Sequence, residues 1–251
     1  MDLERITRRM RLAEGSHQPG KGKGCAMNAI SYLNGDPEIT DFPVCSARPL
    51  AAFVQWSNDL LAGPDGYLSP EDSVVALELA WQTMGTADVP DTVVHAWVAE
   101  LLTDPTWGVL RYVEHAAAKA ISDIAELHRK AASGDIVPIA AWDAADRAAH
   151  AAAREINSTL DAAALYALRA AYESAAPLGA DYWTTLDAIA GNALRAHARV
   201  TDDPAGRGAG RAVDFARHAI RAWRYLAGLD GPQAINHTSI ENALQRVWMS
   251  A

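Results

Sequence analysis

The chain has 251 residues, half of them apolar, so it is long enough for one large helical domain or two small ones and too apolar for wholesale disorder. Its formal net charge of −9 argues against binding to nucleic-acid phosphates unless a local basic patch dominates. The two cysteines do not make a disulfide scaffold, and no apolar run approaches the ~18 residues of a membrane span.

Helix signals recur along the chain, whereas alternating runs of β-branched and aromatic residues do not. We expect a first helix to begin at Cys25, directly after a glycine-rich stretch. Apolar residues at helical spacing predict a second helix through residues 50–61, which Gly63 and Pro64 end.

The middle of the chain contains clear helix starts. Ser69 as the N-cap and Pro70 at the first helical position predict a helix that Gly85 ends. Another helix is expected over residues 90–101. Asp104-Pro105 is expected to open one that runs to about residue 127.

Alanine dominates the second half of the chain. Residues 139–176 contain no Gly or Pro and predict one long helix or two in sequence. Further helices are expected over 181–199, over 213–223 and from Thr238, where a capping box begins. Residues 201–210 predict a flexible loop.

These elements predict an all-α protein with roughly eight to ten helices. We expect a single structural domain, in which a Cys-containing N-terminal segment (residues 1–63) packs on a partly Ala-rich helical body (residues 64–251). Alanine buries little area, so the eight tryptophans are expected to anchor the core.

One neighbourhood, residues 15–59, is more specific than the rest. Gly20, Gly22 and Gly24 surround two lysines just before the expected helix at Cys25. The helix dipole and the lysines would favour a thiolate on Cys25. The glycine-lysine run lacks the order of a phosphate-binding loop, and we interpret it as a mobile turn.

The same neighbourhood contains a Gly-Ser-His element, Cys-x-Met-x-Ala-x-x-Tyr-Leu-x-Gly, Thr-Asp-x-Pro-x-Cys and a closing Asn-Asp. In these motifs the chain resembles uncharacterised proteins of actinobacteria and their phages. The resemblance spans about a fifth of the 251 residues, and at Phe42 the chain departs from members that have His there. It implies a context and no activity. The matching residues are Gly15 to His17, Cys25 to Gly35, Thr40 to Cys45, and Asn58-Asp59.

Two interpretations of this segment involve no chemistry. In the structural one, Cys25 and Cys45 are small buried side chains and His17 caps a turn. Asp41 or Asn58 would then satisfy backbone donors. In the other, the segment lines a ligand pocket.

Two further interpretations use the thiols. A metal site would take its protein ligands from His17, Cys25 and Cys45, a set that zinc accepts, with Asp41 or water as the fourth ligand. A catalytic site would use Cys25 as the nucleophile and His17 as the base, oriented by Asp41 or Asp59. The spacing matches no known signature for either.

Basic residues gather near the N-terminus and again over residues 207–224. We interpret both groups as solvated helix faces and expect no tight sequence-specific binding to nucleic acid. Among the other histidines, none forms a His-Glu-x-x-His or Glu-x-x-His pattern, and five lie on different expected helices: His115, His128, His150, His197 and His218.

The sequence therefore predicts a non-catalytic helical protein, of an actinobacterial phage or its host, that binds a protein or a small molecule. The alternative is a thiol- or metal-dependent enzyme that uses the region of Cys25, Cys45 and His17. The first residues lack an apolar signal core, so we expect a cytoplasmic protein with no membrane association.

Overall fold

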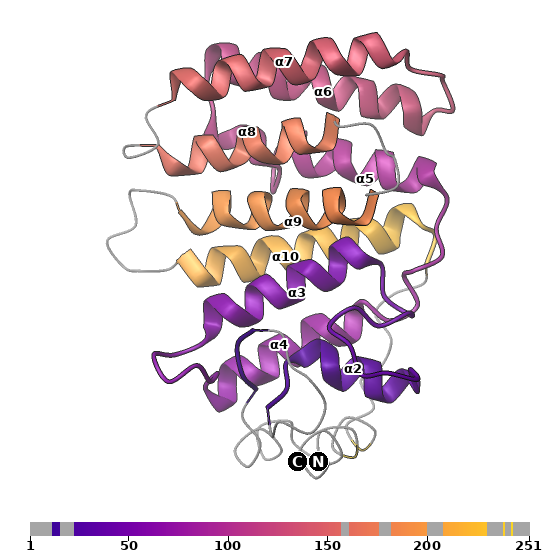
Figure 1. Cartoon of the computed structure of the whole chain (residues 1–251), viewed down its shortest axis with the longest axis vertical. Coiled ribbons are helices and arrows are strands. Elements are labelled where there is room, and N and C mark those ends of the chain that lie inside the picture. The colour runs from indigo at the N-terminus through magenta and orange to yellow at the C-terminus, as the bar shows by residue number, and fades with distance from the viewer. Residues whose placement is uncertain are drawn as a thin grey trace. The chain divides into compact units, whose positions relative to one another are not determined.

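The computed structural model describes residues 12–15, 23–156, 161–175, 182–199 and 208–229, together with positions 238 and 242. Within these ranges the chain contains nine α-helices, one 3-10 helix and no strand beyond isolated bridges (Figure 1). The predicted all-α class with eight to ten helices is confirmed. No helix in the same ranges combines the length and apolar character needed to cross a membrane.

The described residues form two compact units: the first contains the described residues up to Asp88 together with positions 238 and 242, and the second runs from Val89 to Leu229. In the first unit α4 packs on both α2 and α3. The first unit contains α2 (Ala26–Asn34), α3 (Arg48–Leu61) and α4 (Pro70–Gln82). The second contains α5 (Asp91–Thr103), η1 (Val109–Tyr112), α6 (His115–Ala132), α7 (Ile139–Glu155), α8 (Ala162–Ala175), α9 (Tyr182–Ala198) and α10 (Gly208–Leu226).

Local capping explains where the helices of the first unit begin and end. The Ser69 hydroxyl accepts a hydrogen bond from the backbone N–H of Asp72 at 3.0 Å, so the predicted N-cap of α4 is confirmed. Gly35 ends α2 with a φ of 75°, a left-handed conformation that glycine adopts without strain. The helices enclose an apolar core whose large members include Met27, Ile30, Leu50, Phe53 and Leu77.

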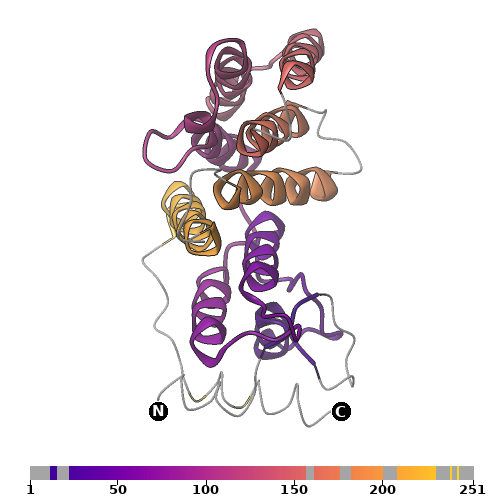
Figure 2. The same ribbon diagram turned by 90° about the vertical axis from the view of Figure 1, so that its left-hand side faces the viewer.

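Tryptophans join helices of the second unit that are distant in sequence. In this unit α5 packs on α6, and α9 contacts both α8 and α10 (Figures 1 and 2). Trp97 of α5 is fully buried, and its Nε1 donates to the Ala219 carbonyl of α10 at 2.9 Å. Its ring meets that of Trp223 edge to face, with 5.2 Å between centroids. The expectation that tryptophans anchor the core is confirmed at both positions.

The expected helix start at Asp104-Pro105 is wrong, because α6 begins only at His115. The Asp104 carboxylate accepts from the backbone N–H groups of Thr106 and Trp107 and so forms a turn instead of a helix start. A Cβ at Gly108 would lie 2.5 Å from the Asp104 nitrogen, so only glycine fits where the chain folds back. The 3-10 helix η1 follows.

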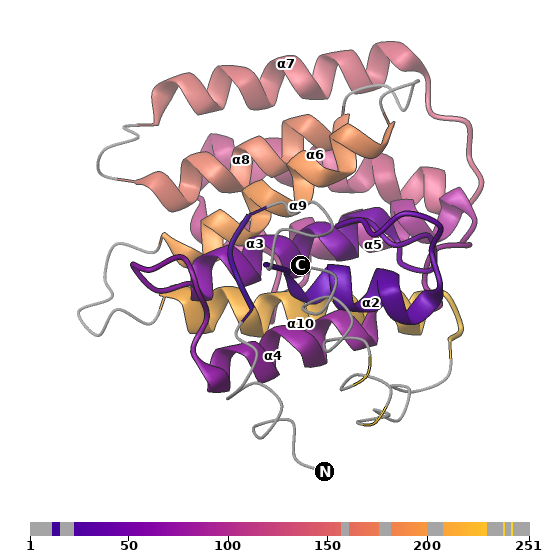
Figure 3. The ribbon, with the colours of Figure 1, turned by 60° about the horizontal axis from the view of Figure 1, so that its bottom comes forward.

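The Ala-rich stretch 139–176 forms two helices, α7 and α8. In the described chain, Ala149 is the one fully buried residue of α7. Figure 3 shows α7 along an edge of its unit, where it packs on α6 and α8. Its small side chains allow this close approach, as expected. Residues 201–207 of the expected loop, and most of the expected helix from Thr238, lie outside the described residues.

Candidate functional site

The segment singled out by the sequence forms a closed polar cluster around Asp41 in the first unit. Asp41 Oδ1 accepts from Cys25 Sγ at 3.4 Å and from Asn28 Nδ2 at 2.9 Å. Asn28 Oδ1 in turn accepts from the backbone N–H of Cys25 at 3.0 Å, at the start of α2. All three residues are buried. The motif residues thus tie the start of α2 to the loop that follows it.

The expectation that Cys25 ionises readily is wrong. Burial raises the pKa of the Cys25 thiol, and the negative charge of Asp41 raises it further. These effects outweigh the helix start and keep the thiol protonated. The predicted base, His17, lies outside the described residues, whereas Asp59 Oδ1 accepts from the backbone N–H of Gly15 at 2.8 Å.

Cys45 lies in a separate environment. It is partly exposed and not disulfide-bonded, and its Sγ lies 3.8 Å from Ser46 Oγ. Burial raises the pKa of this thiol as well. Among the residues with defined positions, no three His, Cys, Asp or Glu side chains come together as metal ligands, so Cys25, Cys45 and Asp41 do not converge. The predicted zinc set also includes His17, and it stays a prediction.

Two further motif residues have structural contacts. Asn58 Nδ2 donates to the carbonyl of Ala13 at 2.8 Å, so this buried side chain satisfies a backbone acceptor and not the backbone donor that the structural interpretation expected. Phe42 lies beneath the Arg48 guanidinium, 4.0 Å from ring centroid to Cζ.

We expect native Cys25 to react slowly with iodoacetamide and to react quickly after unfolding in urea, because it is buried and protonated. Peptide mass spectrometry after timed labelling measures each thiol separately. Cys45, which is partly exposed, serves as the internal control. Native labelling of Cys25 as fast as that of Cys45 would contradict the structural interpretation and favour the nucleophile.

A second candidate site, in the second unit, was not predicted. A cavity of about 470 Å³ opens between α5, the turn after α6, α7 and α8. Its volume falls in the range of small-molecule sites. Apolar side chains make up much of its wall, and its polar lining includes His95, which is partly exposed, and Ser174, which is buried. The lining residues are Asp91, Thr92, His95, Ala131, Gly134, Asp135, Val137, Ile139, Trp142 and Ser174.

A chain of hydrogen bonds runs from this cavity into the protein. His95 Nδ1 lies 2.9 Å from His128 Nδ1, and His128 Nε2 lies 3.1 Å from Ser174 Oγ. Ser174 Oγ donates to the carbonyl of Ala171 at 2.7 Å. The Trp142 ring contacts His128 edge to face, with 4.8 Å between centroids, and is stacked with His95 at 6.2 Å between centroids.

The proton positions along this series of hydrogen bonds follow from the bond between Ser174 and the Ala171 carbonyl. Ser174 Oγ and the Ala171 carbonyl oxygen are 2.7 Å apart, which requires a proton between them, and a carbonyl can only accept. The Ser174 hydroxyl therefore donates to Ala171 and accepts from His128 Nε2–H. Burial lowers the pKa of His128 to about 3, so its ring is neutral and its Nδ1 accepts from His95 Nδ1–H. Burial also lowers the pKa of His95, although nearby Asp91 opposes this. The neutral His95 ring therefore keeps a free lone pair on Nε2.

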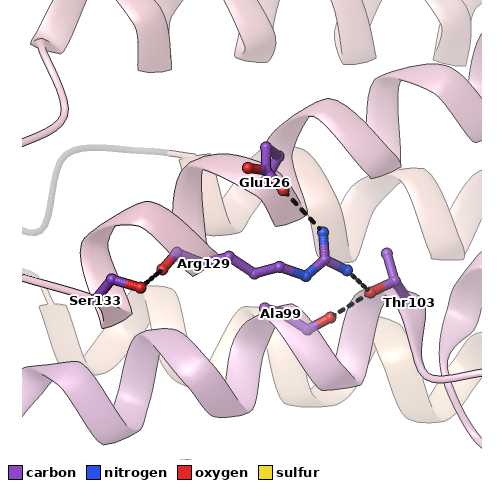
Figure 4. A network of polar contacts seen from close by, with 5 residues as sticks. All are labelled: Ala99, Thr103, Glu126, Arg129 and Ser133. Carbon is purple, nitrogen blue, oxygen red and sulfur yellow. Dashed lines mark hydrogen bonds and ion pairs between the residues drawn. The ribbon is translucent and has the colours of Figure 1, made fainter. Parts of the chain in front are cut away.

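A second hollow, of about 510 Å³, lies on the other side of α5 and α6 and includes Glu100 and Arg129. Its arginine is already engaged: the guanidinium bonds Thr103 at one end and Glu126, at 3.3 Å, at the other (Figure 4). Thr103 donates onward to the Ala99 carbonyl at 2.8 Å. This network ties α5 to α6 and leaves no free cation for an anionic ligand among these groups.

The sequence offered little to reveal the first cavity. His95 and His128 are 33 residues apart, and His128 and Ser174 are 46 apart, so no local motif joins them. Ile136 and Ile139, near the cavity, are 97% and 69% exposed, and their exposure is seen only in the structure.

Comparison with known proteins adds no relative. The chain matches no protein-family model, no curated protein and no solved structure. The similarity to actinobacterial and phage proteins thus stays a prediction.

Proposed function

We propose that this chain is a non-catalytic, cytoplasmic ligand-binding protein and that a small molecule occupies the cavity between α5, α6, α7 and α8. The observation that carries the proposal is the cavity itself. It has the volume of a small-molecule site, a largely apolar wall, and polar groups gathered at His95. Two histidines with lowered pKa values in or beside a cavity add support, because perturbed groups gather at functional sites.

Binding fits this cavity better than hydrolysis. His128 and Ser174 are close enough to resemble a base and its nucleophile. However, the Ser174 proton points to a backbone carbonyl, and the side chain is only 2% exposed. His128 Nε2 is already protonated in this arrangement and cannot take the serine proton. In this proposal, His128 and Ser174 therefore serve to fix the ring of His95.

The proposal is tested by blocking the cavity. Tryptophol, a neutral indole alcohol, is expected to bind the native protein in isothermal titration calorimetry. Ala131→Trp should abolish binding, because Ala131 lines the cavity and the larger ring would fill it.

A matched variant, Ala151→Trp, changes an exposed alanine of α7 outside the cavity and should bind as the native protein does. Equal binding by Ala131→Trp would place the ligand elsewhere and contradict the proposal. Circular dichroism of both variants checks that the helices are retained.

A further inference from the structure

The carboxylates that line the cavity are not balanced by a lysine or arginine in its wall. Asp91 and Asp135 line its mouth, and no lysine or arginine lines it. Neither carboxylate takes part in an ion pair or side-chain hydrogen bond with another described residue. Asp91 is close enough to His95 to oppose the lowering of its pKa. A ligand entering the cavity therefore meets a negative potential.

The His95 ring offers the cavity a hydrogen-bond acceptor. The order of protons along Ser174, His128 and His95 leaves the lone pair of His95 Nε2 without a protein donor in the described chain. His95 lines the cavity, so this nitrogen is the acceptor that its ring offers a ligand. An anionic group would bring a second acceptor to the same place and would face two carboxylates. A ligand group that donates a hydrogen bond is therefore favoured, both by the acceptor on His95 and by the two carboxylates.

The remaining wall suits an apolar or aromatic body. Trp142 presents its indole ring beside His95, with only 24° between the two ring planes. Ala131, Val137 and Ile139 continue the apolar surface toward the mouth. A flat ring can stack on Trp142, and a positive charge near that ring gains a further cation–π attraction.

We propose that the ligand of this cavity is a protonated amine with an apolar or aromatic body, whose ammonium group donates to His95 Nε2 near Asp91 and Asp135. The inference rests on the proposed function and specifies the class of ligand. His128 and Ser174 act as positioning residues, since they hold the His95 proton on Nδ1 and so keep Nε2 unprotonated.

Three indole probes of similar size separate the possibilities: tryptamine, a cation; tryptophol, a neutral alcohol; and indole-3-acetate, an anion. Calorimetric titration near neutral pH should show tryptamine binding at least about tenfold more tightly than indole-3-acetate, because a charge-assisted hydrogen bond replaces a repulsion. Tryptophol should lie between them. Equal affinities for all three would overturn the amine inference and leave the proposed function intact. Binding of none of them would overturn both.

Two variants test the contacts. Asp91→Asn combined with Asp135→Asn should bring the affinities for tryptamine and tryptophol closer together and leave tryptophol binding unchanged, since both positions are exposed. Asp123→Asn, an exposed acid of α6 outside the cavity, is the matched control. His95→Phe keeps a ring beside Trp142 but removes the acceptor, so it should weaken tryptamine more than tryptophol. An undiminished preference for tryptamine in both the double variant and His95→Phe would overturn the inference.

Discussion

Replacing Trp97 by alanine is expected to lower the free energy of unfolding by about 3–5 kcal/mol, the usual loss when a large buried aromatic side chain is truncated. Trp97 has no exposed surface, and it joins α5 to α10 through both ring packing and a hydrogen bond. Truncation leaves a cavity beside Trp223 that the surrounding helices can only partly fill. Urea unfolding followed by circular dichroism measures the loss.

Two further variants separate the contributions. Trp97→Phe keeps an aromatic ring and loses the bond to Ala219, so its loss should be well below that of Trp97→Ala. Tyr225→Ala removes an aromatic side chain that is 83% exposed on α10, and should change stability by no more than about 0.5 kcal/mol. A loss for Trp97→Ala as small as that for Tyr225→Ala would show that Trp97 does not anchor this core.

Acidification from about pH 7.5 to about pH 5 is expected to lower the free energy of unfolding by about 2 kcal/mol for each of two buried histidines, or about 4 kcal/mol together. Burial lowers the pKa of His128 and of His197 from 6.5 to about 3. Between these values the unfolded chain binds protons that the folded chain does not. The stability that the two neutral histidine rings contribute is therefore fully present above pH 6.5 and is lost as the pH falls toward 3.

The surroundings of His197 explain why its proton is so unfavourable. The ring is stacked on Phe215, with 4.0 Å between centroids, and its Nδ1 lies 2.8 Å from the Tyr112 hydroxyl. After burial, the positive charges of Arg111 and Arg211 are further causes of the lowered pKa. Among the described residues, no carboxylate raises the pKa of His197 to offset these effects.

Urea titrations at several pH values check this prediction. His128→Gln and His197→Gln should each reduce the pH slope by up to about 1.4 kcal/mol per pH unit, because each removes one proton taken up on unfolding. His115→Asn is the control: the His115 side chain is 93% exposed, and asparagine tolerates its positive φ of 49°. If neither glutamine variant changed the slope, the two histidines would not be the groups that titrate on unfolding.

The sequence alone determined the all-α class and the helix starts that depend on neighbouring residues. The start of α4 at Ser69 and Pro70 was predictable because an N-cap bond spans only three residues. The start of α6 was not, because the Asp104 side chain bonds the backbone of Thr106 and Trp107 and competes with the helix. Both outcomes are local, and the second depends on a close backbone approach at Gly108 that sequence does not reveal.

The candidate site was decided by the tertiary structure. Cys25 and Asp41 were both named from the sequence, but only their burial together showed that the thiol stays protonated. His95, His128 and Ser174 come from α5, α6 and α8, and their hydrogen bonds exist only because these helices pack on one another. Packing is set by apolar burial summed over whole helix faces, and no short pattern around any one of the three residues encodes it.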